Sequence, residues 1–326
     1  MSSYKQHLNK IEDEQYLSSF VKNIEAELFF QFITWKENLI KLYFYICEDR
    51  GIQRYLSSMR MSNNYKPEFT DQEVMTVYIH GTTAGFSKVK QIYKYTRRYL
   101  SDWFPLLPSY QAFCDRLNKL PYCFQILVRS INCTALQGLA FKNEKVIDSV
   151  PIIVTGKSRS SSAKVAPQLC NKGYCSSKQM YYYGLKLHVT GIIRPFELPM
   201  PEASWITGAG ENDLTVARPV FESTSNCKIY ADKIYGDTEL DARMQATQNS
   251  IVLTPVKKEK GQTIVNAADD IYSYLVSTVR QPIESFFNWI IEKTQIQFAQ
   301  RVRSEKGLLI HVWANMQRHY SYYLTF

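Results

Sequence analysis

A chain of 326 residues is long enough to bury a sizeable core, in one large domain or two ordinary ones. Its seven cysteines are scattered without paired CxxC spacing, which argues against a disulfide framework or a structural zinc site and favours a cytoplasmic protein with reduced thiols. The net charge is +9, and this basic excess suggests a phosphate-bearing partner.

No signal peptide or membrane segment is expected. The N-terminus, MSSYKQHLNKIEDEQ, has no apolar core, and the most apolar stretch, 26–47, is interrupted by Lys36, Glu37 and Lys41.

The first 140 residues predict an all-helical region. Between 20 and 47, apolar residues recur every three or four positions, as on one face of a helix. Thr70 and Glu73 have the spacing of a capping box and predict a helix start. Another helix is predicted over 122–139.

The run KVKQIYKYTRRYL, at 88–100, mixes tyrosines with Lys94, Arg97 and Arg98. Aromatic side chains can stack on bases and cations can bind phosphates, so the run is typical of a DNA-contacting helix. The same pattern also fits an amphipathic helix whose tyrosines face the core.

Beyond residue 140 the pattern changes to strands separated by helices. The order is three strands, helix, strand, helix, strand, helix, which matches ribonuclease-H-like α/β domains. The predicted strands are 145–148, 180–190, 192–199 (after a turn at Gly191), 228–232 and 250–256. The predicted helices are 212–221, 237–248 and a long one that begins near 278, after a polar loop over 259–270.

The first part of this α/β region is basic. Between 141 and 190 there are eight Lys and Arg residues against two acids. Lys157 and Arg159 lie in a Ser-rich loop, and Lys186 and His188 alternate along a predicted strand, so that both side chains fall on one face. These four residues are candidate DNA contacts; a solvated basic loop and a structural histidine are the alternative interpretations.

Three acids have positions that suggest metal chemistry. Asp148 and Asp232 end predicted strands, and Glu284 lies on the last long helix. Strand ends converge on one edge of an open α/β sheet, so the two aspartates are expected to meet. Clustered carboxylates favour Mg2+ or Mn2+ over zinc. Two such ions can activate a water and stabilise the leaving oxygen of a phosphodiester. Asp213 and Asp237 are interpreted instead as helix caps, with a supporting role at the site as the alternative for Asp213.

Four motifs, in this order, resemble the core of DDE insertion-sequence transposases, and most of all insertion-sequence family 982. They are VIDSVP (146–151), YYYGLKLHV (181–189), KIYADKIYGDTEL (228–240) and RQPIESFFNWI (280–290). The similarity covers most of the chain, because 69–93 and 107–120 also resemble the N-terminal region of that group.

The resemblance implies that Asp148, Asp232 and Glu284 are the catalytic and metal-binding triad for two divalent cations, Mg2+ or Mn2+, with Asp148 bridging both. It also implies that Arg280 contacts DNA near the cut. Pro282 fits most readily in the first turn of a helix, so whether Arg280 and Glu284 share a helical face is left open. The more distal lysine of the wider superfamily is not at its usual place, and Lys293 is a candidate substitute.

The expected protein is a bacterial, cytoplasmic transposase that is associated with the nucleoid when bound to DNA. It would bind double-stranded DNA at the terminal inverted repeats of its own element through residues 1–140. A ribonuclease-H-like DDE domain at 141–326 would cleave and transfer strands, in a homodimer that pairs two ends. The alternatives are an inactive or repurposed DNA-binding copy and a ribonuclease-H-like nuclease.

Overall fold

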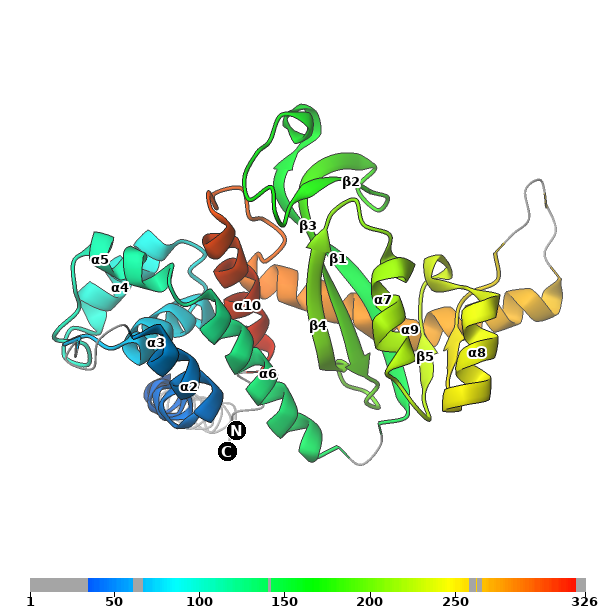
Figure 1. The fold of residues 1–326 in the computed structure, drawn as a ribbon, viewed down its shortest axis with the longest axis horizontal. Coiled ribbons are helices and arrows are strands. Elements are labelled where there is room, and N and C mark those ends of the chain that lie inside the picture. The colour runs from blue at the N-terminus through cyan, green and yellow to red at the C-terminus, as the bar shows by residue number, and fades with distance from the viewer. Residues whose placement is uncertain (1–34, 61–66, 140–141, 258–261, 263–265, 321–326) are drawn as a thin grey trace, which may run out of the picture.

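The computed structural model describes residues 35–60, 67–139, 142–257, 262 and 266–320. Helices gather at one end of the molecule, and a sheet flanked by further helices forms the rest (Figure 1). Residues 35–48 are helical, in line with the helix predicted over 20–47; its first part lies outside the described residues. The other helices of this end are α2 (Arg50–Met59), α3 (Asp71–Thr83), α4 (Val89–Tyr99), α5 (Tyr110–Leu117) and α6 (Pro121–Gln137).

Local capping signals set the helix starts at this end. The Glu73 backbone N–H donates to the Thr70 hydroxyl at 3.2 Å, and the Glu73 carboxylate accepts from the Thr70 N–H at 2.6 Å, which confirms the predicted capping box. Helix α6 begins at Pro121, where the missing N–H removes no helical hydrogen bond.

The sheet has the order β2-β3-β1-β5-β6, and β4 pairs with β3. The β1–β3, β2–β3 and β3–β4 pairs are antiparallel, whereas β1–β5 and β5–β6 are parallel. This mixed sheet, preceded by helices, confirms the predicted ribonuclease-H-like α/β fold. The strands are β1 (Glu144–Gly156), β2 (Asn171–Cys175), β3 (Met180–Ile192), β4 (Met200–Gly208), β5 (Lys228–Tyr230) and β6 (Ile251–Leu253). The remaining helices are η1 (Lys157–Ser161), α7 (Asp213–Glu222), η2 (Lys233–Tyr235), α8 (Thr238–Gln248), α9 (Ala267–Thr294) and α10 (Glu305–Tyr320).

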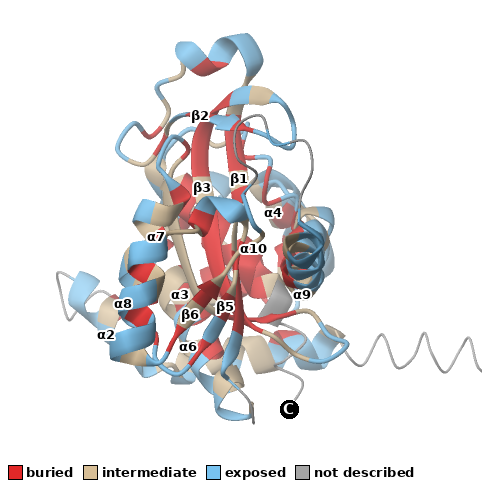
Figure 2. Cartoon of the chain, turned by 90° about the vertical axis from the view of Figure 1, so that its right-hand side faces the viewer, coloured by how far each residue is buried: buried red, intermediate tan, exposed pale blue. Residues whose placement is uncertain are grey.

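Helices cover both faces of the sheet. Val150 and Ile152 of β1 belong to a large core shared with α9 and α10, whereas Ile147, on the opposite face, packs with Phe221 of α7. The buried strands accordingly lie between α9 on one side and α7 and α8 on the other (Figure 2). The large core continues into the N-terminal helices, since α10 packs on α6 and α3. The predicted domain boundary, between 140 and 141, lies outside the described residues.

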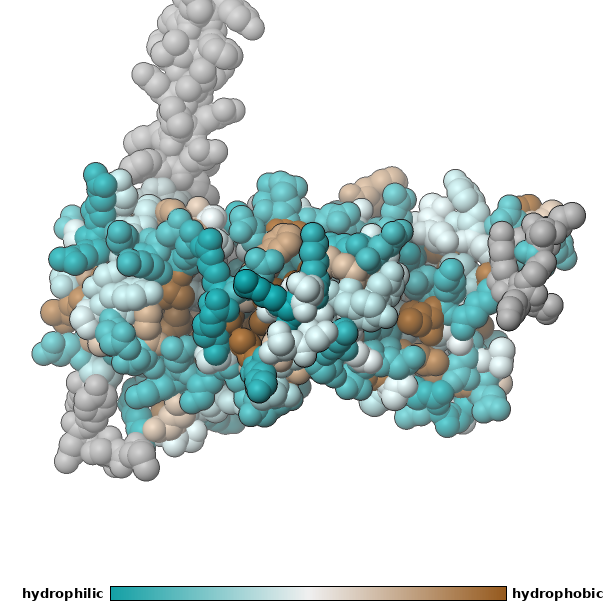
Figure 3. Space-filling model, turned by 90° about the horizontal axis from the view of Figure 1, so that it is seen from above, coloured by the Kyte–Doolittle hydropathy of each residue, from teal (hydrophilic) through white to brown (hydrophobic). Residues whose placement is uncertain are grey.

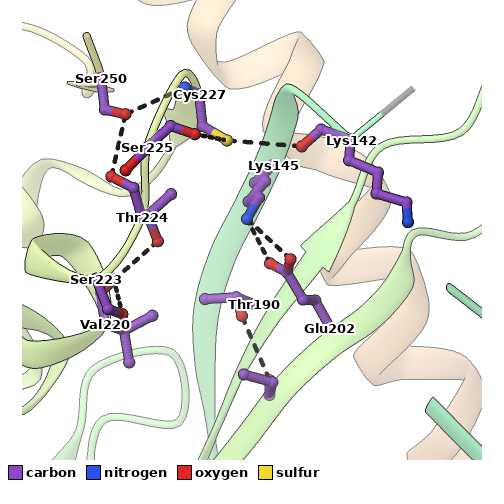
Figure 4. A network of polar contacts seen from close by, with 11 residues as sticks. Lys142, Lys145, Thr190, Glu202, Val220, Ser223, Thr224, Ser225, Cys227 and Ser250 are labelled. Carbon is purple, nitrogen blue, oxygen red and sulfur yellow. Dashed lines mark hydrogen bonds and ion pairs between the residues drawn. The ribbon is translucent and has the colours of Figure 1, made fainter. Parts of the chain in front are cut away.

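Polar contacts tie the strands together near the start of β1 (Figure 4). The buried Lys145 forms an ion pair with Glu202 of β4 at 2.7 Å. Ser250, just before β6, accepts from the Cys227 N–H at 3.1 Å and donates to the Thr224 carbonyl at 3.2 Å. The first contact ties β1 to β4, and the others tie the segment before β5 to the segment before β6.

Four strand predictions were wrong in extent. The strands predicted over 228–232 and 250–256 are shorter, and end at Tyr230 and Leu253. The first strand continues through Pro151 to Gly156. Proline has no N–H to donate to a neighbouring strand, but β5 pairs with β1 only as far as Val146, so no hydrogen bond to β5 is lost at Pro151. The strand predicted over 192–199 is a connection that contains two prolines; β3 continues to Ile192 and β4 begins only at Met200. The turn expected at Gly191 is absent because Gly191 pairs with Val146 inside the sheet.

The last long helix begins earlier than predicted, at Ala267, where the Asn266 side chain caps it. Pro282 therefore lies inside α9, although it cannot donate a helical hydrogen bond. The helix continues because Val276, before the proline, and Ile283 and Phe287, after it, are all buried.

Candidate active site

The register of two parallel strands brings Asp148 and Asp232 together. Val146 of β1 pairs with Tyr230 of β5, and each aspartate lies two residues further along its chain. The two carboxylates therefore stand at the same level of the sheet. Asp232 lies just past the end of β5, where its Oδ1 accepts from the Lys233 N–H at 2.8 Å.

Arg280 connects the third acid to this pair. Its Nη1 lies 2.9 Å from Asp148 Oδ2, and its Nη2 forms an ion pair with Glu284 Oε1 one turn further along α9. The Arg280 side chain is only 15% exposed, and its Nε has no hydrogen-bond partner among the described residues. Because α9 continues through Pro282, Arg280 and Glu284 share a helical face, which answers the question that the sequence left open.

The three acids interact electrostatically. Burial raises the pKa of Asp148 from 3.8 to about 6, and the charges of Asp232 and Glu284 add to this rise. The Ser149 N–H and the Arg280 guanidinium act in the opposite direction. A buried carboxylate with two acidic neighbours is a position where an added cation is stabilised.

This pKa shift makes the stability of the metal-free protein depend on pH. Asp148 holds its proton up to about pH 6 in the folded chain, but only up to about pH 3.8 in the unfolded chain. Its favourable contribution to the free energy of unfolding is therefore complete below pH 3.8 and is lost as the pH rises through 6. Asp148→Asn is therefore expected to raise the unfolding free energy by roughly 1–3 kcal/mol at about pH 8. Urea unfolding in EDTA measures this gain, which should shrink toward about pH 5; a gain independent of pH would contradict the assignment.

The structure places Lys186 and His188 on the opposite face of the sheet from Asp148. Asp148 pairs with Val189, whereas His188 pairs with Ser149, so the two sets of side chains alternate. Lys186 Nζ forms an ion pair with Asp213 at 2.7 Å. Both candidate DNA contacts therefore face away from the three acids.

His188 is held by its own packing. It is fully buried, its ring stacks on Trp205 at 5.2 Å, and its Nε2 lies 2.7 Å from the Thr207 hydroxyl. Burial lowers the pKa of His188 to about 4, so the ring is neutral at physiological pH.

The prediction that Asp213 is a helix cap was wrong, because it lies near the site with its own buried partners; Tyr235 is a second neighbour, which sequence reasoning did not single out. The N-cap of α7 is Asn212, while Asp213 is buried and accepts from the Ser149 hydroxyl at 3.2 Å. Burial and then the charges of Asp213, Asp148 and Asp232 raise the pKa of Tyr235 well above its usual value. Tyr235 thus interacts electrostatically with acids on both faces of the sheet. In the sequence, its position three residues after Asp232 could have indicated that it lies near the site.

Asp237 confirms its predicted role as a helix cap. Its Oδ1 accepts from the backbone N–H groups of Glu239 and Leu240 at 3.1 and 3.2 Å, and its other oxygen pairs with Arg218. Lys293, the candidate distal lysine, pairs with Glu292 at 3.1 Å.

The remaining candidate DNA contacts are exposed. Helix α4 forms as predicted, with Ile92 and Thr96 buried and the Tyr93 hydroxyl donating to the Pro108 carbonyl at 2.8 Å. Its tyrosines 93 and 95 are half-buried, as the amphipathic alternative requires. The exposed cations among the candidate DNA contacts are Lys94, Arg97 and Arg98 on α4, and Lys157 and Arg159 on η1.

The mixed sheet, with aspartates at one level of two adjacent parallel strands and a glutamate on the covering helix, defines the class as a ribonuclease-H-like α/β protein. Residues 139–305, just over half of the chain, match the family model described as Transposase DDE domain. The chain therefore belongs to the DDE-domain transposase family. A comparison with curated proteins gives no match. In the described part of the chain, every helix is too short or too polar to cross a bilayer.

The donor set fits a divalent cation, because carboxylate oxygens are the ligands that Mg2+ and Mn2+ prefer, and DDE transposases generally use such ions. The three carboxylates, as they are arranged in this structure, do not form a complete metal site. Among the described residues, no group of three or more His, Cys, Asp or Glu is placed to hold a metal ion, and a guanidinium joins Asp148 to Glu284 instead.

Proposed function

We propose that this chain is the transposase of an insertion element resembling insertion-sequence family 982, and that it cleaves and transfers DNA strands at Asp148, Asp232 and Glu284. The observation that carries the proposal is the β1–β5 register, which sets Asp148 and Asp232 side by side within the matched DDE domain. The Arg280 contacts, which join Glu284 to that pair, support it.

The acids have distinct roles in this proposal. Asp148, which is less exposed than Glu284, would be the shared ligand of two divalent cations, with Asp232 completing one site and Glu284 the other. Such cations, when bound, supply an activated water and neutralise the leaving oxygen of a phosphodiester. The short β5 strand and the η2 turn fix the Asp232 carboxylate, and the Lys233 N–H orients one of its oxygens.

Arg280 would exchange partners during the reaction. Its guanidinium now neutralises Asp148 and Glu284, a role that a bound cation would take over. The planar fork that fits a carboxylate also fits a phosphate. Released from the acids, Arg280 would contact the DNA phosphate next to the cut.

The N-terminal region, 1–140, would recognise the inverted repeats, and 141–326 would catalyse cleavage. The exposed cations of α4 are the candidate backbone contacts on this end of the molecule. Pairing two element ends would require a homodimer.

The test is cleavage of the DNA that flanks the gene. End-labelled fragments with the flanking inverted repeats, incubated with the purified chain and Mg2+ or Mn2+, should be nicked at the repeat ends to leave a 3′-OH, and EDTA should stop the reaction. Specific binding without cleavage would instead identify a repurposed DNA-binding copy. Cleavage of unrelated DNA or RNA to the same extent would identify a general nuclease.

A further inference from the structure

Two exposed tyrosines and a lysine form an outward-facing cluster on the β2–β3 hairpin. Tyr174 pairs with Tyr181 across the strands, their ring centroids are 5.0 Å apart, and the two residues are 52% and 57% exposed. Lys172 Nζ lies 4.8 Å from the centre of the Tyr181 ring. We propose that this tyrosine platform (Lys172, Tyr174 and Tyr181) is a stacking site for unpaired DNA bases.

The charge around the platform favours a nucleic acid. Between 149 and 196 the chain has seven Lys and Arg residues and no Asp or Glu. Five of these cations are exposed, and none of the five has a carboxylate partner in the part of the chain that the structure describes: Lys157, Arg159, Lys164, Lys172 and Lys178. Lys172 Nζ also donates to Ser161 at 3.2 Å, which places η1 and its cations beside the platform. Figure 3, which looks onto the top of Figure 1, shows hydrophilic side chains over the middle of that face, with some apolar residues between them.

The fold itself does not require the exposed pair. A cross-strand aromatic pair stabilises a hairpin, but here packing comes from the other face, where Tyr182 and Cys175 are buried with Ile153. Both platform rings keep about half of their surface in water, and the nearest cation lies over a ring instead of pairing with an acid. Aromatic faces flanked by unneutralised cations are the surface to which single-stranded nucleic acid binds, through base stacking and phosphate contacts.

The platform has a defined position relative to the acids. Asp148 pairs with Val189, eight residues along β3 from Tyr181, so the alternation of side chains puts Asp148 and Tyr181 on the same face of the sheet. At a strand rise of about 3.3 Å per residue, the separation is roughly 26 Å, or about eight nucleotides of B-form DNA. The inference rests on the proposed function in one respect: the bound bases would belong to the strand that the acids cut.

The test compares two double variants with the wild type, in EDTA so that no catalysis occurs. Tyr174→Ala with Tyr181→Ala removes the rings, and Tyr174→Phe with Tyr181→Phe keeps them. The probes are a fluorescent oligothymidylate of about 16 nucleotides and a duplex of equal length. The alanine variant should lose roughly tenfold or more in affinity for the single strand and less than about twofold for the duplex, while the phenylalanine variant binds both as the wild type does. Equal loss for both probes, or no loss, would overturn the proposal.

A second measurement uses the unaltered protein, in case the alanine variant does not fold. An oligothymidylate with 5-iodouracil, irradiated in complex with the wild type and mapped by mass spectrometry, should cross-link to Tyr174 or Tyr181. Cross-links confined to other residues would overturn the proposal. Neither measurement needs cleavage, so failure of the catalytic assignment and failure of the platform are distinguishable.

Discussion

Asp232→Asn is expected to slow metal-dependent cleavage of an element end by roughly a thousandfold or more, because a ligand to a catalytic cation supplies several kcal/mol of transition-state stabilisation. Binding to the same DNA should change little, because Asp232 donates no hydrogen bond and carries no positive charge toward a phosphate. Gel-based cleavage and filter binding on the same fragment measure both quantities.

Asp237→Asn is the matched control. Asp237 lies five residues away and carries the same charge, but it caps α8, a role that asparagine fulfils as well. Its cleavage rate should stay within a fewfold of the wild type. Wild-type cleavage by Asp232→Asn, or equal loss in both variants, would remove Asp232 from the catalytic site.

Arg280→Gln is expected to tighten Mn2+ binding about tenfold or more while slowing cleavage. In the metal-free chain the guanidinium neutralises Asp148 and Glu284, so a cation must displace it; glutamine leaves the carboxylates to repel one another until the metal binds. Cleavage slows because the variant also lacks the proposed phosphate contact.

Isothermal titration with Mn2+ measures the affinity directly, without DNA. Lys293→Gln removes an exposed cation of the same helix that pairs with Glu292, and it should leave the Mn2+ affinity unchanged. Weaker binding by Arg280→Gln would mean that the arginine supports the metal site instead of competing for it.

The fold and the positions of the acids were accessible from the sequence because they depend on local patterns. Short apolar runs located β1, β3 and β5, and capping residues located α3, α7 and α8. Asp148 and Asp232 follow apolar segments, so their proximity could be inferred without coordinates, and the β1–β5 register agrees with it. The prediction that Asp148 ends its strand was wrong, because β1 continues to Gly156.

What the sequence did not predict depends on longer-range packing. The alternation of Lys186 and His188 was visible in the sequence, but only the β1–β3 register shows that both lie on the opposite face of the sheet from Asp148. Pro282 favoured a helix start, yet burial of Ile283 and Phe287 keeps α9 helical through it. Asp213 was predicted to be a helix cap because it lies beside Asn212 at the start of a helix. Its actual partners, Lys186 and Ser149, are distant in the sequence and are brought to it only by the fold.

If Asp148, Asp232 and Glu284 hold the cations that cleave DNA, exchanging one of these oxygen ligands for sulfur should change the metal preference of the reaction. Asp232→Cys replaces a hard oxygen ligand with a thiolate, which Mg2+ binds poorly and the softer Mn2+ tolerates better. Cleavage of the element end should be lost in Mg2+ and restored at least in part by Mn2+, relative to the wild type in each metal. Wild-type cleavage by this variant in Mg2+, or an equal loss in both metals, would contradict the assignment of these ligands.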